Sequence, residues 1–327
     1  MHAITLKEFG GPEMMELSQV DTPLAGDGQI LIAVANASVN RPDVIQRMGN
    51  YPPPPGDSEI LGLEVAGTVE SVGDGVTRYA PGDRVFGLVG GGGYAEYCVA
   101  REDHCMPVPE NLDFAQAACI CETYITAYLN LFLLGEAAGK PSVLIHGGGG
   151  GVATSGIQLC RALTPDTAIF VTASGGKLER VREQGADHVF DYREQDFAAE
   201  IKTLTGGRGV DVILDHIGAK YLESNMKSLA RAGTLMLIGV MGGIRAELNL
   251  AAMMVKRQRI IGSVLRSRPV AEKASIIARF EETVMPLFAS GELLPEISAA
   301  FPLKHAAEAH RMMESGGHFG KIVLEMG

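Results

Sequence analysis

The chain has 327 residues, of which 46% are hydrophobic, and its formal net charge is −11. This apolar fraction predicts a sizeable buried core and excludes an intrinsically disordered chain. The excess of acidic residues argues against a surface for nucleic acid or anionic membranes, and the apolar runs are too short to predict a transmembrane helix. The five cysteines are irregularly spaced and the first residues show no signal-peptide pattern. We therefore expect a cytoplasmic protein with reduced thiols, most of them in the core.

The first 120 residues predict a domain of short strands. Turn signals such as Gly73-Asp74-Gly75 and Pro81-Gly82-Asp83 separate short apolar runs. The proline-rich run Tyr51–Gly56 cannot be helical and predicts a stiff loop. We expect a compact, mostly antiparallel β domain with strands at Ala3–Leu6, Met15–Val20, Gln29–Val39, Glu64–Val72, Arg84–Leu88 and Tyr94–Val99.

The middle of the chain predicts a different architecture. After a helical link at Ala115–Leu134, apolar strands alternate with helical patterns. Strands are expected at Val143–His146, Ala168–Ala173, His188–Phe190, Val210–Asp215, Thr234–Gly239 and Ile260–Leu265. Helices are expected after the glycine run at 147–151 and at Lys177–Gln184, Glu194–Leu204, Ala219–Ala230 and Leu250–Gln258. Six strands with helical crossovers predict an α/β fold with a doubly wound parallel sheet, a Rossmann domain.

The C-terminal segment returns to β character. A helix is expected at Ala271–Ser290, followed by strands at Glu296–Pro302 and Lys321–Glu325 around a helix at Lys304–Ser315. We expect this tail to rejoin the first domain. The predicted boundaries are 1–122 with 267–327 for the discontinuous β domain, and 123–266 for the Rossmann domain.

The glycine run predicts a dinucleotide site. The strand Val143–His146 enters Gly147–Gly151, and a helical pattern follows at once. Backbone N–H groups without side chains in the way, at a helix N-terminus, suit a pyrophosphate. In the G-x-G-x-x-A pattern the residues are Gly148, Gly150 and Ala153, with Gly149, Gly151 and Val152 also expected at the cofactor. The alternative is a flexible glycine loop between two core elements.

The end of the second strand predicts which dinucleotide binds. An NAD enzyme usually has Asp or Glu here, to accept hydrogen bonds from the ribose hydroxyl. This chain instead has Ser174-Gly175-Gly176-Lys177. A lysine opposes the dipole at a helix start, and a 2′-phosphate would resolve that conflict. We therefore expect NADPH; the alternative is an ordinary solvated turn.

A family resemblance covers nearly the whole chain. It is carried by the motifs Ser38–Asp43, Gln46–Gly56, Leu61–Gly67, Gly82–Val85, Gly92–Tyr97, Thr126–Tyr128 and Ser263–Arg268. With the order of elements, these resemble the medium-chain dehydrogenase/reductase superfamily, and more narrowly its zinc-independent quinone oxidoreductase branch. The resemblance implies a GroES-like catalytic β domain beside the Rossmann domain. It also implies cofactor contacts from Asn40, Thr126, Tyr192, Gly239, Met241, Leu265, Arg266 and Lys321.

The resemblance also bears on metal and catalysis. Zinc-dependent members carry a Cys near the position of Asn40 and Gly-His-Glu where this chain has Gly62-Leu63-Glu64, so we expect no metal. Hydrogen-bond donors must then polarise a substrate carbonyl. The candidates are Asn40, Asp43 and Tyr51. Their alternative roles are a turn cap, the first acid of a short helix, and a ring packed on the prolines.

The resemblance implies NADPH-dependent reduction of quinones or α,β-unsaturated carbonyls, with a small-molecule substrate and no nucleic-acid partner. Two alternatives stay open. One is an enoyl-thioester reductase, which would need a basic entrance such as Arg266 and Arg268 for the carrier phosphate. The other is a non-catalytic, crystallin-like protein that binds NADPH. We expect a homodimer, because Arg259–Leu265 matches the edge strand through which this superfamily commonly pairs.

Overall fold

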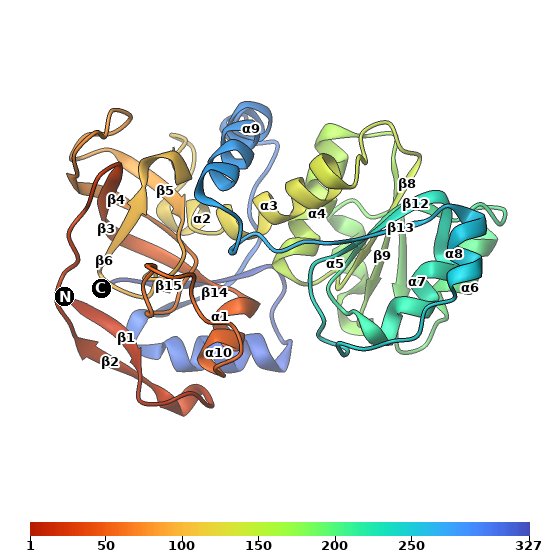
Figure 1. The fold of residues 1–327 in the computed structure, drawn as a ribbon, viewed down its shortest axis with the longest axis horizontal. Helices are drawn as coiled ribbons and strands as arrows, with labels where there is room; N and C mark the ends of the chain where they lie inside the picture. The colour runs from red at the N-terminus through yellow and green to blue at the C-terminus, as the bar shows by residue number, and fades with distance from the viewer. The chain divides into compact units, whose positions relative to one another are not determined.

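The structure is a computed structural model that describes residues 1–327. The chain divides into two compact units, residues 1–125 with 266–327 (unit 1) and residues 126–265 (unit 2). Each unit has its own sheet, and the chain crosses from one to the other within α3 (Cys121–Tyr128) and again after β13 (Arg259–Gly262) (Figure 1).

Unit 1 is built on a seven-stranded sheet with the order β14-β15-β3-β4-β5-β7, in which β6 also pairs with β3. All pairings in this sheet are antiparallel except that of β14 with β15. A separate hairpin joins β1 to β2. The strands are β1 (His2–Leu6), β2 (Met15–Gln19), β3 (Gln29–Val39), β4 (Glu64–Val72), β5 (Arg84–Leu88), β6 (Tyr97–Arg101), β7 (Cys105–Pro107), β14 (Ile297–Pro302) and β15 (Lys321–Glu325). The helices are α1 (Arg41–Arg47), α2 (Phe114–Ala117), α9 (Val270–Ala289) and α10 (Ala306–Ser315), with short 3₁₀ turns at Pro12–Met14, Glu102–His104 and Leu303–His305.

The long strand β3 organises unit 1, because it pairs with β4, β6 and β15. Its buried side chains, among them Ile30, Ile32 and Val39, join those of β4, β15 and α10 in one core cluster. Gly67 on β4 is required by the close approach of β3, because a Cβ there would lie 2.1 Å from the carbonyl oxygen of Ala33. The β3–β15 pairing brings the C-terminal strand against residues some 280 positions earlier in the chain.

Unit 2 contains a six-stranded, all-parallel sheet with the order β10-β9-β8-β11-β12-β13. The strands are β8 (Ser142–His146), β9 (Ala168–Ala173), β10 (His188–Asp191), β11 (Val210–Asp215), β12 (Leu229–Leu237) and β13 (Arg259–Gly262). The connecting helices are α4 (Gly151–Leu163), α5 (Leu178–Glu183), α6 (Phe197–Leu204), α7 (Leu222–Ser228) and α8 (Leu250–Lys256), with turns at Leu129–Leu134 (π), Gly175–Lys177 and Ala219–Tyr221 (3₁₀). The predicted α/β class with a doubly wound sheet is confirmed.

Most predicted elements are present, and the differences have local causes. The strand expected at Tyr94–Val99 is β6 at Tyr97–Arg101, because Tyr94 instead bonds to Leu61 and Ile4 across a turn. β12 begins five residues before the expected Thr234, and β13 ends at Gly262 rather than Leu265. The sequence did not predict the short strand β7. Helix α1 contains Asp43, which the sequence analysis had considered as the first acid of a short helix.

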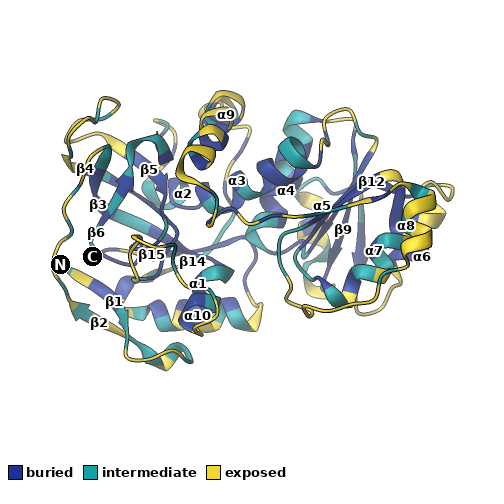
Figure 2. Cartoon of the chain, in the orientation of Figure 1, coloured by how far each residue is buried: buried dark blue, intermediate teal, exposed yellow.

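Burial follows the sheets. The inner strands of both sheets are mostly dark in Figure 2, whereas α6 and α8 carry exposed surface. All five cysteines are buried and unpaired, as expected. None of the helices has the length and apolar character that crossing a membrane would need.

Candidate cofactor site and candidate catalytic cluster

The glycine run of unit 2 connects β8 to α4. The first helical hydrogen bond is made by Thr154 N–H to the oxygen of Gly150 (3.0 Å), so the N–H groups of Gly151, Val152 and Ala153 have no partner within the chain. Three unpaired N–H groups at the start of a thirteen-residue helix are donors of the kind that bind anions. The site lies at the carboxyl end of β8, beside the switch point between β8 and β11, where ligands of such sheets bind.

The glycines leave space that side chains would fill. A Cβ on Gly148 would lie 2.6 Å from Val171 Cγ1 and 2.9 Å from Val181 Cγ2, and one on Gly149 would lie 2.3 Å from Lys177 Cδ. The loop is therefore fixed by close packing and is not merely flexible. This cradle fits a dinucleotide pyrophosphate.

Lys177 lies over the glycine run. The position of a Cβ on Gly149 is 2.9 Å from Lys177 Nζ, so the ammonium is held beside the loop. Burial, followed by the charge of Arg180, lowers the pKa of Lys177. Lys177 is the N-cap residue of α5. The sequence had predicted this position at the start of a helix.

An acid that the sequence did not predict also lies at the tip of β9. The position of a Cβ on Gly175 is 2.7 Å from Asp191 Oδ2, at the end of the neighbouring strand β10. Ser174 caps the turn without a side-chain hydrogen bond, and Tyr192 is 38% exposed with Arg193 over its ring at 5.7 Å. The turn thus offers Ser174, Lys177 and Tyr192 together with a carboxylate from Asp191.

The remaining unit 2 candidates lie near the same sheet edge or in helix α3. Gly239 follows β12 and packs on His216, the residue after β11, while Met241 N–H donates to His216 O (3.1 Å). A Cβ on Gly147 would lie 2.5 Å from His216 Cε1, so the imidazole covers the start of the glycine run. Leu265 is buried, and Thr126 lies in α3, where its carbonyl accepts a hydrogen bond from Asn130.

In unit 1, the buried carboxylate of Glu64 collects several of the predicted residues. Its Oε1 accepts hydrogen bonds from Ser38 Oγ (2.5 Å), Asn40 Nδ2 (2.9 Å) and Lys321 Nζ (2.9 Å). Its Oε2 accepts the backbone N–H of Glu122 (2.8 Å). Pairing of β3 with β4 and β15 brings these residues together.

Asn40 and Lys321 are both occupied inside this cluster. Asn40 Nδ2 donates to Glu64 and to Ser38 O (3.4 Å), and its Oδ1 accepts from Lys321 (2.5 Å). Lys321 also donates to Val39 O (3.3 Å) and is only 3% exposed. The expected donation from Asn40 to a substrate would therefore require one of these bonds to be exchanged.

Asp43 lies in the first turn of helix α1 and is fully buried. Its Oδ2 accepts the N–H of Asn40 (2.8 Å) and the hydroxyl of Tyr94 (3.0 Å), while Oδ1 has no partner. Burial raises the pKa of Asp43 to about 6. Asp43 thus acts as an acid in the first turn of a short helix, where its side chain binds the backbone N–H of the N-cap residue Asn40.

A second chain of bonds leads from Asp43 to α10. Tyr94 bonds His310 Nε2 (3.1 Å), and Arg47 donates to His310 Nδ1 (3.2 Å) and in two bonds to Glu314 (2.8 and 3.0 Å). Burial, with the charge of Arg47, lowers the pKa of His310 to about 3, so the ring is neutral. Because arginine only donates, the proton of His310 lies on Nε2.

Tyr51 and Arg266 form the third part of the unit 1 cluster. Arg266 is 5% exposed and donates to Gly90 O (2.9 Å), Tyr51 O (3.2 Å) and Gln46 Oε1 (2.8 Å). Its guanidinium lies 5.1 Å from the centre of the Tyr51 ring, whose hydroxyl makes no hydrogen bond. Arg266 therefore fixes the Tyr51 loop, and its bonds lie within unit 1.

The basic entrance considered for a carrier phosphate is not supported by these contacts. Arg266 is buried, and Arg268 is paired with Glu272. No group of three or more His, Cys, Asp or Glu in the structure is arranged to hold a metal ion.

Sequence reasoning missed Glu64, Glu122, Tyr94, His310 and Arg47 as members of these networks. Glu122 offered one signal, because it is a charged residue inside the apolar helical pattern Ala115–Leu134. The others are joined by long-range strand pairing, which no local pattern encodes.

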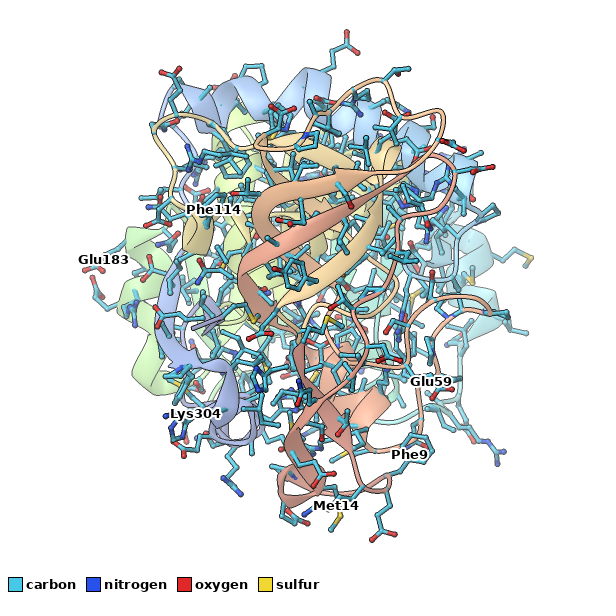
Figure 3. All side chains as sticks on the ribbon, turned by 90° about the vertical axis from the view of Figure 1, so that its left-hand side faces the viewer. Phe9, Met14, Glu59, Phe114, Glu183 and Lys304 are labelled. Atoms are coloured by element: carbon cyan, nitrogen blue, oxygen red, sulfur yellow. The ribbon has the colours of Figure 1, made fainter.

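Unit 1 also has a separate groove with a volume of about 520 Å³. Phe9 and Glu59, labelled in Figure 3, lie on its walls, which come from β1 and from the loop after α1. Of the groups described above, only Gln46 lines this groove, so it is distinct from the polar cluster around Glu64.

Two family models match the chain. Residues 26–110 match the alcohol dehydrogenase GroES-like domain, and residues 184–324 match a domain described as zinc-binding dehydrogenase. Quinone oxidoreductase from Rattus norvegicus is 36% identical over 99% of this chain and 97% of its own length.

Solved structures also resemble this chain over its full length. The Escherichia coli quinone oxidoreductase, solved as a complex with NADPH, is 26% identical with a TM-score of 0.89 and full coverage of both chains. The enoyl-reductase-type cyclopropanase of the curacin A pathway is 26% identical with a TM-score of 0.88, covering 100% of this chain and 99% of its own. With the parallel sheet, the glycine cradle and the identity over the full length, the chain belongs to the quinone oxidoreductase branch of the medium-chain dehydrogenase/reductase superfamily and is an oxidoreductase.

Proposed function

We propose that this protein reduces quinones or α,β-unsaturated carbonyl compounds, with NADPH as its cofactor and without a metal ion. The observation that carries the proposal is the closely packed glycine cradle at the N-terminus of α4, together with a polar cluster in unit 1 that offers a tyrosine hydroxyl and no metal-ligand set. Unit 2 is the NADPH-binding domain in this proposal, and unit 1 is the catalytic domain.

The cofactor is NADPH, as in the related Escherichia coli enzyme. The N–H groups of Gly151 and Val152 would hold the pyrophosphate, with Gly148, Gly149 and Gly150 shaping the loop. Ser174, Lys177 and Tyr192 would hold the adenosine 2′-phosphate. The nicotinamide supplies hydride. Thr126, Gly239, Met241 and Leu265 are proposed to contact the rest of the dinucleotide.

The substrate carbonyl would be polarised by Tyr51. Its hydroxyl is free and its loop is held by Arg266. Burial, followed by the charge of Glu122, raises the pKa of Tyr51 to about 12, so the phenol keeps its proton and donates a hydrogen bond. Asn40, Asp43 and Lys321 support this arrangement from within the Glu64 cluster. In place of zinc ligands, the cluster has the Asn40 amide and the Lys321 ammonium on Glu64.

The test is loss of nicotinamide absorbance with a panel of quinones and enones. Turnover of at least one member is expected, together with less than one zinc per ten chains in the active protein. Failure with every member while NADPH still binds would favour the non-catalytic alternative. One zinc per active chain would contradict the metal-independent mechanism.

The cofactor assignment has its own test. Wild type is expected to prefer NADPH over NADH by about tenfold or more, roughly 1.4 kcal/mol for a charge-assisted phosphate contact. Lys177→Ala should raise KM for NADPH and leave KM for NADH nearly unchanged. Arg180→Ala, one turn along α5, is the matched charge control. Equal losses for both cofactors, or a wild-type preference for NADH, would contradict the assignment.

Enoyl-thioester reduction is the second candidate, favoured by the curacin-pathway relative. Arg266 is buried and Arg268 is paired with Glu272, so these two residues do not offer the basic entrance considered for a carrier phosphate. A comparison of crotonyl thioesters with simple enones separates the two activities.

We propose a homodimer joined through β13. This strand pairs only with β12, so its other edge is open, and the neighbouring Leu250, Met254 and Val255 are exposed. Light scattering should give about twice the 34.6 kDa chain mass. A 34.6 kDa particle at micromolar concentration would exclude the dimer. We place the protein in the cytoplasm, where its five unpaired cysteines would stay reduced.

A further inference from the structure

The reduction proposed above needs a proton as well as a hydride. Addition of hydride to a quinone or to an enone leaves an oxyanion on the substrate. Tyr51, whose hydroxyl is free, can donate a hydrogen bond to this oxygen but holds its own proton strongly. The amide of Asn40 has no acidic proton to give.

Glu122 lies in the same cluster. It is in the first turn of α3, and its N–H is fixed by Glu64 Oε2 (2.8 Å), the carboxylate that also binds Asn40 and Lys321. Its side chain is half-buried, and its carboxyl makes no hydrogen bond or ion pair in the structure. An acid near a helix N-terminus is usually a solvated, charged residue that stabilises the dipole. The surroundings of Glu122 oppose that charge.

The groups facing Glu122 come from several elements. Glu64 on β4 and Asp43 on α1 are negative, and Lys321 on β15 and Arg266 are positive. The positive groups are already bonded elsewhere: Lys321 to Glu64, Asn40 and Val39 O, and Arg266 to Gly90 O, Tyr51 O and Gln46. Burial, reinforced by Glu64 and Asp43, raises the pKa of Glu122 to about 8. The carboxyl of Glu122 therefore keeps its proton at neutral pH.

We infer that Glu122 is the general acid of the reduction and that its carboxyl proton neutralises the oxyanion formed on the substrate. This rests on the proposed function. The substrate gains the hydride and its electron pair, and NADPH is oxidised to NADP⁺. The O–H bond of Glu122 breaks and an O–H bond forms on the substrate, giving a hydroquinone or an enol that tautomerises to the ketone. The Glu122 carboxylate then takes a proton from water.

The pKa of Glu122 suits a proton donor to the substrate oxyanion. A phenolate like that of a reduced quinone has a conjugate-acid pKa of about 10. An acid near 8 gives up its proton to such an oxygen, and at neutral pH it is recharged by solvent. Asp43 is less suited, because it is fully buried and its pKa of about 6 leaves it largely ionised.

The test compares wild type with Glu122→Gln across about pH 6 to 10, using a quinone that wild type reduces. The glutamine keeps the shape of the side chain but has no acidic proton. We expect kcat to fall about 100-fold, with Kd for NADPH unchanged. The wild-type decline in kcat above about pH 8 should disappear in the variant. Glu122→Asp should keep the decline at a lower rate, and Glu70→Gln, an exposed acid on β4, should match wild type.

A glutamine variant with wild-type kcat and the same alkaline decline would overturn the role of Glu122 and leave the proposed function standing. A wild type that reduces no quinone or enone would remove both. Circular dichroism shows whether the glutamine variant is folded. Should it not fold, Glu122→Asp decides, because an unchanged rate and decline in that variant would also contradict a proton donor at this position.

Discussion

Arg47 offers the sharpest test of how unit 1 is held together. The side chain is fully buried. It donates to Gly10 O (3.0 Å), to His310 (3.2 Å) and in two bonds to Glu314, whose side chain is 26% exposed. It thereby ties α1 to α10 and fixes the neutral tautomer of His310, which in turn bonds Tyr94. Replacing Arg47 by Met fills most of the volume and removes the charge and all of these bonds.

The expected loss follows from the groups left behind. Gly10 O and His310 Nδ1 lose a donor, at about 1 to 3 kcal/mol for each buried acceptor. Glu314 loses its cation, but its partial exposure lets water solvate it. Removing one member of a buried pair costs about 3 to 5 kcal/mol. The methionine recovers part of this through apolar burial, so we expect about 3 kcal/mol, or a Tm lower by roughly 6 to 12 °C for a domain of this size.

The assay is urea and thermal unfolding followed by far-ultraviolet circular dichroism, because the chain has no tryptophan. Unit 2 contains none of the altered contacts, so where two transitions are resolved its transition is an internal control. Glu314→Gln and the double variant complete a cycle for the pair. A loss below about 1 kcal/mol for Arg47→Met, or simple additivity with Glu314→Gln, would refute the view that this ion pair joins the two helices.

Three further predictions concern the site. Tyr51→Phe should lower kcat/KM for quinones at least about tenfold with an unchanged Kd for NADPH, and equal kinetics would remove Tyr51 as a donor. Gly148→Ala should cost about 1 to 3 kcal/mol and weaken NADPH binding in calorimetry, because its Cβ would meet the fully buried Val171 and Val181 at 2.6 and 2.9 Å; unchanged binding would show that the loop yields. Because the pKa of Glu122 is raised to about 8 from its ordinary value of 4.5, the folded state binds its proton more tightly and stability falls as pH rises between these values. Glu122→Gln should flatten that fall in Tm, and identical pH profiles of stability would contradict the raised pKa.

The sequence predicted the parallel sheet well for a physical reason. The inner strands of such a sheet are buried on both faces, so Ala168–Ala173 and Val210–Asp215 are mostly apolar runs between turn residues. Their bounds agree with β9 and β11. At the sheet edge the pattern is weaker, because β13 is only partly buried, and its end was predicted three residues late.

The candidate catalytic cluster was predictable only in part. Asn40 and Tyr51 lie in local motifs and could be named from the sequence. Their partners could not, because Lys321 reaches Asn40 through the pairing of β15 with β3, some 280 residues away in the chain. The carboxylate of Asp191 was missed beside the turn at Gly175 for the same reason. It enters the turn after β9 from the neighbouring strand β10.

The positive groups of the two units differ in how they are bonded. Unit 1 holds four buried cations, Arg47, Arg266, Lys273 and Lys321, and each is bonded to acceptors of unit 1 itself. An anionic cofactor therefore finds few unengaged donors among them. Unit 2 instead has unpaired N–H groups at the start of α4, and the side chain of Lys177 lies beside Gly149. The internal cations of unit 1 have a different effect, because they satisfy Glu64 and fix the Tyr51 loop while leaving Glu122 without a partner. This pattern of charge supports the proposal that unit 2 binds the cofactor phosphates and that unit 1 supplies the proton.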